Sequence, residues 1–291
     1  MRDKGRGVEM GITDRRPALE RLLSREKDSN PAGRAGKDKI KIGVVGLSAA
    51  AGVSFLAFSL ARHIANMKKQ MPALLEIGDG NENLSGWNYD AIGIDKRFSG
   101  RDYVSFYKNA AECRSINKLA NMDEGINFAL RVPSEAGIAP DLQQMTSLIN
   151  NVSGDVIVCD VSARLSFGEA EEERQLACLK RLLQEMTLVL FVVNPLPAKL
   201  LGGHKRLAMI KEMETAAQDV LYVVNMYGRG VNKKELYDYL KPRERVTIGL
   251  APADELYEAE FNCKNPYQMA GVKAAASAAI EAILGRAGVT P

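Results

Sequence analysis

The sequence predicts an α/β protein with a doubly wound, mostly parallel sheet of about seven strands and helices on both faces. Segments rich in β-branched residues alternate with segments of helical periodicity from residue 39 onward. The segments "DVIVCDV", "LVLFVVN" and "VLYVVNM" are apolar throughout, which is typical of strands covered on both faces in a parallel sheet. In such a sheet the ligand binds beyond the carboxyl ends of the strands, so the loops that follow the strands are where a site is expected.

The predicted elements follow one another in a regular order. Strands are expected near residues 39–46, 72–78, 125–132, 155–161, 187–193, 219–225 and 245–249. Helical stripes are formed by Leu56, Leu60, His63, Ile64 and Met67, by Leu176, Leu179, Leu182 and Leu183, and by Met269, Val272, Ala276, Ile280 and Ile283. On such a stripe His63 is expected at the edge of the core rather than as a ligand. The last stripe predicts a helix packed on the sheet.

Charge separates the chain into two parts. Residues 1–38 hold ten Lys/Arg and seven Asp/Glu, so this segment carries the whole net charge of +3 and residues 39–291 are formally neutral. The segment has few large apolar residues, which predicts a disordered basic tail followed by a single domain over 39–291. A short helix is expected where Leu19, Leu22 and Leu23 share a face. A solvated leader and a docking peptide both fit this tail, and it lacks the apolar core of a signal peptide.

Composition excludes several classes of protein. The four cysteines contain no CxxC pair and there are two histidines, so neither a zinc site nor a disulfide framework is indicated, and a reducing cytoplasm is expected. The neutral domain offers no strong nucleic-acid signal. Ile42–Ala61 is a run without a charge, but its glycines, serines and alanines argue against a transmembrane segment.

The first loop has the layout of a phosphate cradle. The stretch "GVVGLSAAAGVSFLAFSLAR" runs from a β-branched segment through small residues into a helical pattern that begins near Val53. A cradle needs backbone N–H groups at a helix N-terminus, and small side chains let the chain approach an anion closely. The small residues here are Gly46, Ala49, Ala50, Ala51 and Gly52. The stretch contains no lysine.

From Lys39 onward the chain resembles the MinD/ParA family of deviant P-loop ATPases. In that family the loop carries a signature lysine, two glycines, any residue, a glycine, a second lysine and a Ser/Thr. Here Ser48 and Val53 stand at the two lysine positions, whereas Gly52 and Ser54 keep the pattern. The resemblance implies a P-loop fold and a nucleotide site formed by Gly46, Ser48, Ala49, Ala50, Ala51, Gly52, Val53 and Ser54, with Asn225 on the adenine side.

Two further landmarks of the family are partly kept. In "EIGDGNENL", Glu76 and Gly78 stand at the positions of two aspartates, the second of which orients the attacking water. Gly78 has no side chain for that task, and the adjacent Asp79 could take it over only if the loop shifted. In "DVIVCDVSAR", Asp160 resembles the aspartate that holds magnesium with Ser54, while Arg164 replaces a switch glycine.

The long stretch 78–102 has no regular pattern, and a connection of that length is usually functional. It holds Trp87, for which a partner anchor and a lid packed on the core both stay open.

The resemblance therefore implies a fold with impaired chemistry. A hydrogen bond to a charged group contributes about 1.5–3 kcal/mol, so losing both lysines weakens nucleotide binding by about 3–6 kcal/mol. We expect a homodimeric, hydrolysis-deficient scaffold that binds ATP and Mg²⁺ weakly at most. Similarity to degenerate TadZ/CpaE-like members implies a cytoplasmic protein, peripheral at the membrane through a partner from a pilus or secretion assembly.

Two alternatives stay open at this point. One is an active but divergent ATPase that uses Asp79 or Arg164. The other is an NAD(P)-dependent oxidoreductase, for which "YDYLK" offers Tyr237 and Lys241 at the spacing of a short-chain dehydrogenase pair.

Overall fold

The computed structural model describes residues 39–78, 93–100, 102–132, 138, 141–162, 165 and 169–289. All of them belong to the unit Lys39–Pro291. The predicted tail, Asp79, Trp87 and Arg164 lie outside the described residues.

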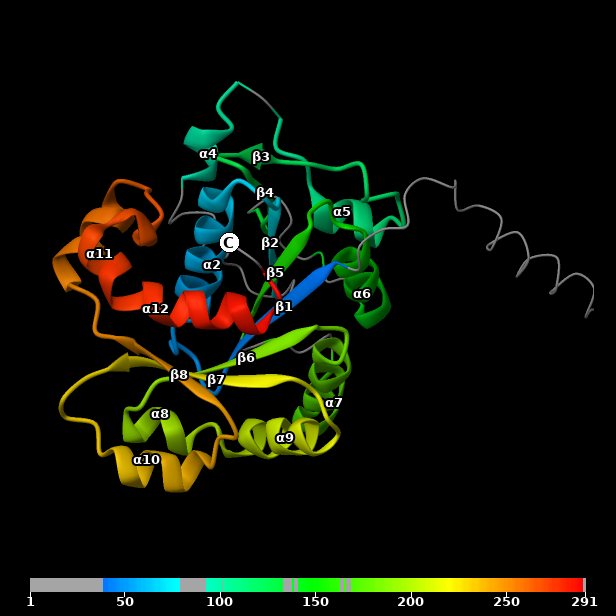
Figure 1. The fold of residues 1–291 in the computed structure, drawn as a ribbon. Helices are drawn as coiled ribbons and strands as arrows, with labels where there is room; N and C mark the ends of the chain where they lie inside the picture. The colour runs from blue at the N-terminus through cyan, green and yellow to red at the C-terminus, as the bar shows by residue number, and fades with distance from the viewer. Residues whose placement is uncertain are drawn as a thin grey trace, which may run out of the picture. The chain divides into compact units, whose positions relative to one another are not determined.

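The described part of the chain forms an eight-stranded sheet with helices on both faces (Figure 1). The strands are β1 (Ile40–Gly46), β2 (Pro72–Ile77), β3 (Met122–Asp123), β4 (Ile126–Ala129), β5 (Val156–Val161), β6 (Leu188–Val193), β7 (Val220–Tyr227) and β8 (Arg245–Gly249). The helices are α2 (Val53–Met67), α4 (Ile94–Arg97), α5 (Phe106–Ala111), α6 (Leu142–Asn151), α7 (Glu172–Leu183), α8 (Pro197–Leu201), α9 (His204–Thr215), α10 (Lys233–Leu240), α11 (Ala253–Phe261), the short 3₁₀ helix η2 (Pro266–Gln268) and α12 (Ala270–Arg286).

The sheet is parallel except at one edge, as predicted. Its strand order is β3-β4-β2-β5-β1-β6-β7-β8, and only β3 pairs with its neighbour in the antiparallel direction. The expectation of about seven strands missed β3, because two residues are too short to show a periodicity. The turn between β3 and β4 is tight, since Glu124 and Gly125 both have a positive φ, 47° and 79°.

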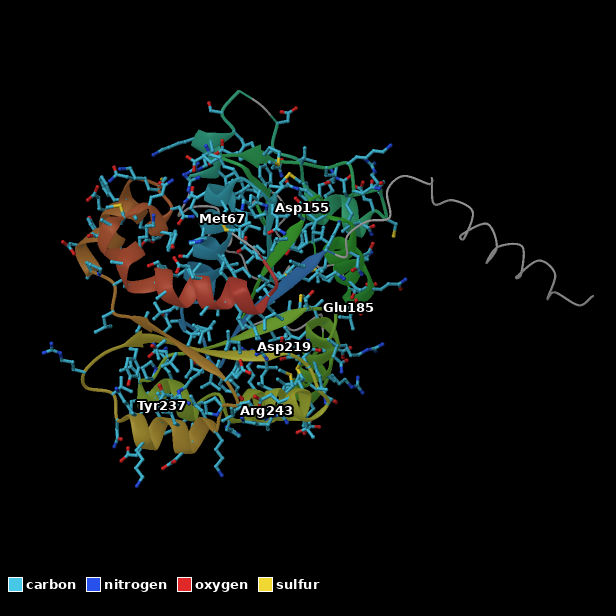
Figure 2. All side chains as sticks on the ribbon, in the orientation of Figure 1. Met67, Asp155, Glu185, Asp219, Tyr237 and Arg243 are labelled. Carbon is cyan, nitrogen blue, oxygen red and sulfur yellow. The ribbon has the colours of Figure 1, made fainter. Side chains whose placement is uncertain are left out.

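Two apolar layers cover the two faces of the sheet. In β1, Val44 belongs to the layer that contains α2 and α12, whereas its neighbour Val45 belongs to the layer that contains α6, α7 and α9. Successive side chains of a strand point to opposite faces, so a strand that contacts both layers has apolar residues on both faces. Every residue of β5 and β6 is buried, which confirms the interpretation of the apolar segments. Figure 2 shows side chains filling the space between the sheet and the helices.

The uncharged run Ile42–Ala61 contains most of β1, the following loop and the first half of α2. Within the described ranges, no helix is long and apolar enough to cross a membrane. The stripe of α2 faces the core, where Leu56, Leu60 and Ile64 are buried. His63 is half-buried at the core edge, as predicted, with Nδ1 2.8 Å from the hydroxyl oxygen of Tyr267.

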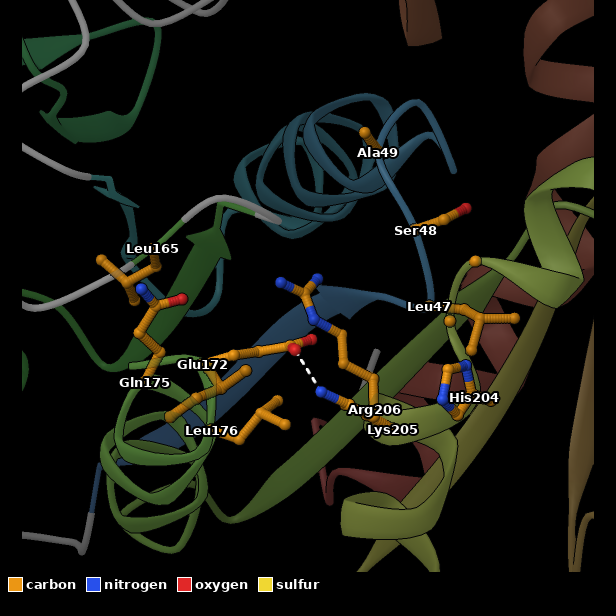
Figure 3. Close-up of a pocket in the computed structure, with 13 residues that line it drawn as sticks. Leu47, Ser48, Ala49, Leu165, Glu172, Gln175, Leu176, His204, Lys205 and Arg206 are labelled. Carbon is orange, nitrogen blue, oxygen red and sulfur yellow. Dashed lines mark hydrogen bonds and ion pairs between the residues drawn. The ribbon is translucent and has the colours of Figure 1, made fainter. Parts of the chain in front are cut away.

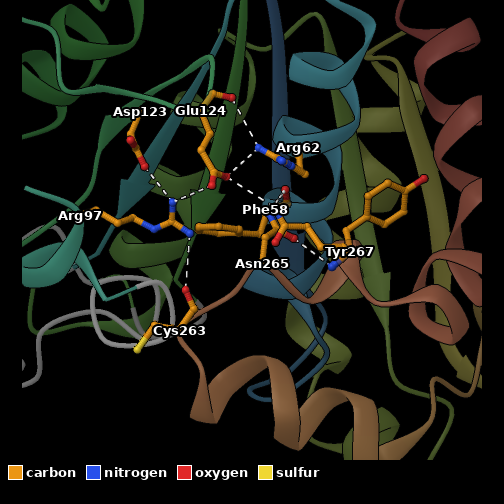
Figure 4. A network of polar contacts seen from close by, with 9 residues as sticks. Phe58, Arg62, Arg97, Asp123, Glu124, Cys263, Asn265 and Tyr267 are labelled. Atoms are coloured by element: carbon orange, nitrogen blue, oxygen red, sulfur yellow. Dashed lines mark hydrogen bonds and ion pairs between the residues drawn. The ribbon is translucent and has the colours of Figure 1, made fainter.

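Charged side chains tie the β3 edge of the sheet to segments distant in sequence (Figure 4). Arg97 of α4 lies 2.7 Å from Asp123 and 3.3 Å from Glu124, and it also donates to the carbonyl of Cys263 at 3.4 Å. Arg62 of α2 pairs with the same Glu124 at 2.7 Å. These contacts connect α4, the β3–β4 turn, α2 and the segment that follows α11.

Candidate functional site

The loop between β1 and α2 has the backbone form of an anion cradle. Ala50 and Gly52 adopt left-handed conformations with φ of 59° and 92°. Helix α2 begins at Val53, as predicted, with neither a side-chain cap nor an acidic residue in its first turn. The first N–H groups of a helix have no acceptor within the helix, so this N-terminus is suited to an anion.

Gly52 is required by the fold at this position. A Cβ built on Gly52 would lie 2.0 Å from the side-chain nitrogen of Asn225, and its φ of 92° is one that L-residues rarely adopt. The absence of a side chain at Gly52 lets Asn225 come close to the loop, where the same nitrogen donates to the carbonyl of Ala51 at 2.9 Å. Asn225 lies near the carboxyl end of β7 and is buried, so it anchors the loop to the sheet.

Two more side chains hold carbonyl groups of the same loop. Arg206 of α9 donates to the carbonyl of Gly46 at 3.0 Å, and Asn194, just after β6, donates to that of Ala50 at a longer 3.5 Å. Burial lowers the pKa of the Arg206 guanidinium, and the charge of Glu172 opposes that shift. With its carbonyls bound from three directions, the loop has a fixed backbone. Sequence reasoning missed Arg206 and Asn194.

A cavity of about 390 Å³ opens beside the loop, between α7 and the start of α9 (Figure 3). Ser48 and Ala49 of the loop contribute to its wall, together with Gln175, Lys205 and Arg206. Lys205 also forms an ion pair with Glu172 across the cavity. Two cations and one carboxylate leave the wall with a small positive surplus.

Two buried carboxylates lie side by side on the neighbouring strands β2 and β5. Asp160 of β5 is in register with Val44 of β1 and with Glu76 of β2. By the alternation of side chains, both carboxylates point to the face that α2 covers, because Val44 belongs to the layer packed on α2. Ser54 stands at the second position of α2. The predicted magnesium ligands Ser54 and Asp160 are therefore on the same face of the sheet. In the described ranges, no three His, Cys, Asp or Glu side chains gather as a metal site.

The comparisons with known proteins address this architecture. No family model matches the sequence, and no curated protein matches it. Among solved structures, the septum site-determining protein MinD of Pyrococcus horikoshii, complexed with Mg-ADP, has 15% identity and a TM-score of 0.64, over 86% of this chain and 98% of that one.

Two other solved structures are similar. The ParA family ATPase of Chlorobium tepidum has 15% identity and a TM-score of 0.62, over 84% of this chain and 98% of that one. The MinC:MinD complex of Aquifex aeolicus gives 13% identity and a TM-score of 0.61, over 84% of this chain and 96% of the matched chain. The chain has the fold of the MinD/ParA ATPases. The predicted fold class is confirmed.

The predicted phosphate-site residues of this MinD/ParA fold differ in exposure. Ala49 and Ala50 are exposed and Ala51 is buried. Ser48 is half-buried, and its hydroxyl is buried without a hydrogen-bond partner in the described part of the chain. Val53 is partly buried and packs against the α2 layer. At the second lysine position of the family motif, the Val53 side chain therefore contacts the core.

Gly78 has room for a side chain. Among the described residues, a Cβ built there would meet only the Cβ of Ser162, at an ordinary 3.8 Å. Glu76, at the position of the other aspartate, is buried and accepts from the backbone N–H of Arg131 at 3.2 Å. An aspartate at position 78 is therefore sterically possible, whereas Glu76 already has a structural role.

The oxidoreductase pair lies elsewhere. The Tyr237 ring on α10 is covered by the guanidinium of Arg245, 3.9 Å from its centroid. Lys241 ends that helix in a left-handed conformation, with its N–H bonded to the carbonyl of Tyr237. Neither residue lines the cavity beside the loop that contains Gly46 and Gly52.

Proposed function

We propose that this protein is a hydrolysis-deficient MinD/ParA-like scaffold that positions a cellular assembly and binds ATP weakly at most. One observation carries the proposal: the loop keeps its backbone form, while Ser48 and Val53 stand where the family carries its two lysines. The residues fit the backbone part of a phosphate site and, with Ser54 and Asp160, a magnesium position. They do not supply the charge on which phosphoryl transfer depends.

Catalysis is the function most affected. Gly78 stands where the family has the aspartate that orients the attacking water, and Asp79 lies outside the described residues. Arg206 lines the cavity beside Ser48 and could supply a positive charge in place of the family's lysines, but its guanidinium donates to the carbonyl of Gly46. It therefore stabilises the base of the loop. The alternative of an active, divergent ATPase is favoured by one observation, which is that Lys205 and Arg206 line the cavity against Ser48.

Calorimetric titration with ATP and Mg²⁺ tests the proposal. We expect a dissociation constant weaker than about 100 μM, because losing about 3–6 kcal/mol lowers affinity about 10²- to 10⁴-fold. Steady hydrolysis and micromolar binding by the unmodified protein would favour the active ATPase instead.

Restoring the missing groups tests the geometry of the loop. The variant Ser48→Lys, Val53→Lys, Gly78→Asp should gain measurable affinity for ATP if the backbone cradle is intact. A neutral twin, Ser48→Gln, Val53→Gln, Gly78→Asn, has side chains of similar size without the charge. Because Val53 packs on the core, the thermal stability of both variants must be compared first. Equal affinity in both variants would show that charge is not what the loop lacks.

We further propose that the chain forms a homodimer without nucleotide, through the carboxyl ends of β6, β7 and β8. Exposed apolar side chains gather there, namely Leu196, Leu201, Met226 and Leu250. Sedimentation should give a dimer at tens of micromolar chain with or without ATP, and a monomer in both cases would contradict the scaffold model.

The proposed cellular role rests on the resemblance to MinD/ParA proteins. The Aquifex aeolicus MinD was solved as a complex with MinC, which supports a protein partner for this fold. For this chain we propose a component of a pilus or secretion assembly, which would hold a cytoplasmic scaffold at the membrane. Purification of the complex from the native cell, with and without residues 1–38, tests that assignment.

A further inference from the structure

Helix α11 presents an exposed stripe that combines two aromatic rings with two carboxylates. Tyr257 and Phe261 are 70% and 74% exposed, and their rings stack with centroids 6.1 Å apart and planes 18° apart. Asp254 and Glu258 are exposed and fall on the same side of the helix, since residues three and four apart are neighbours. Figure 1 shows α11 at the periphery of the ribbon.

The stripe is held on a rigid support. Ala259, on the opposite side of α11, is fully buried. Glu255 accepts from the backbone N–H groups of Gly271 and Val272 at 2.8 and 3.1 Å, so it fixes α11 to the start of α12. Arg97 holds the carbonyl of Cys263 just beyond the helix. A pre-organised surface loses little conformational entropy when it binds a partner.

The charge of α11 is one-sided. The helix "ADELYEAEF" contains four acidic residues and no basic one, and Glu255 alone among them is used as a cap for α12. Carboxylates beside aromatic faces suit arginine, because a guanidinium pairs with the carboxylate and stacks on the ring. Phosphate-bearing surfaces such as nucleic acid or anionic lipid would be repelled. A twofold contact of α11 with itself would oppose like charges.

We propose that this stripe, Asp254–Tyr257–Glu258–Phe261, docks a cationic segment of a protein partner. The segment presents two arginine or lysine side chains about 6 Å apart, the spacing of neighbours one helical turn apart or two residues apart in a strand. The inference rests on the proposed scaffold function, because it names the chemistry of the partner that such a scaffold would hold.

A photo-cross-linking amino acid placed at Tyr257 of the full chain in the native cell tests the proposal. The expected product is a cross-link to a partner segment that carries at least two Arg or Lys residues within one turn. Glu258→Lys should lower its yield about tenfold, because it puts a repulsive charge beside the site. Glu260→Lys makes the same charge change on another side of α11 and should leave the yield nearly unchanged. The cross-linker at Met122, an exposed apolar residue of β3, should not capture that partner.

Several results would overturn the proposal. They are a cross-link to a second copy of the chain, a cross-link to an acidic or purely apolar segment, equal yields from the two lysine variants, and no cross-link specific to Tyr257. ATP titration of the same variants separates this outcome from the scaffold model. Weak ATP binding with no cationic partner refutes the inference alone, whereas tight binding with hydrolysis refutes the proposed function.

Discussion

Replacing Gly52 by alanine tests whether the loop is fixed by packing. An L-residue at φ of 92° costs about 1–2 kcal/mol, and the new Cβ would stand 2.0 Å from the side-chain nitrogen of Asn225. Displacing that buried amide breaks its hydrogen bond to Ala51 and leaves polar groups unpaired, which costs about 1–3 kcal/mol more. We expect Gly52→Ala to lower the free energy of unfolding by about 2–5 kcal/mol in urea titrations.

Gly100 provides the matched control. Its φ is 83°, nearly that of Gly52, but within the described part of the chain no atom lies within 4 Å of a Cβ built there. Gly100→Ala should therefore cost only the backbone term of about 1–2 kcal/mol. The difference between the two variants reports the contact with Asn225, and it should shrink in an Asn225→Ala background. If Gly52→Ala destabilises the protein no more than Gly100→Ala, Asn225 does not hold the loop as described.

Three further predictions concern charge, acidity and reactivity. Arg97→Ala should lower the free energy of unfolding by about 2–4 kcal/mol, since it removes the 2.7 Å ion pair with the partly buried carboxylate of Asp123, whereas Arg286→Ala at an exposed pair should cost under about 1 kcal/mol. Burial lowers the pKa of His63, so the folded state favours neutral histidine; stability should fall as pH drops below the ordinary value of 6.5, and His63→Gln should flatten that slope in urea titrations at several pH values. A maleimide should label exposed Cys113 in the native protein and spare Cys159, whose thiol pKa burial raises to about 12, as peptide mapping would show.

The strands were predictable because burial on both faces leaves a simple pattern. The segments of β5, β6 and β7 are apolar along most of their length, with Asp160 and Asn225 near the carboxyl ends of β5 and β7, and their order along the chain indicated the parallel sheet. The two-residue strand β3 left no such pattern, since its pairing depends on the turn at Glu124 and Gly125. The start of α2 at Val53 followed from the small residues before it.

The anchors of the loop were harder to predict, because they are long-range contacts. Arg206 follows Gly46 by 160 residues, and nothing in its local sequence points to that carbonyl. A signal did exist for the asparagines. The sequence "VVN" occurs at the ends of both β6 and β7, and these strands pair in register, with Val193 beside Val224. Asn194 and Asn225 are therefore neighbours at one edge of the sheet, beside the loop.

Packing contacts explain the form of the loop, which has no charged residue of its own. Gly52 is fixed by Asn225, and Gly203 must lack a side chain because its Cβ would lie 2.4 Å from Leu47. These constraints come from β7 and α9, and any substitution that broke them would destabilise the sheet. Neither Ser48 nor Val53 fixes the backbone in that way, since Ser48 is half-buried and Val53 packs on the core through its side chain. The form of the loop is thus set by packing contacts from β7 and α9, which need no ligand. For this reason the shape of the loop alone is no proof of nucleotide binding, and the charge-restoring variant is the informative experiment.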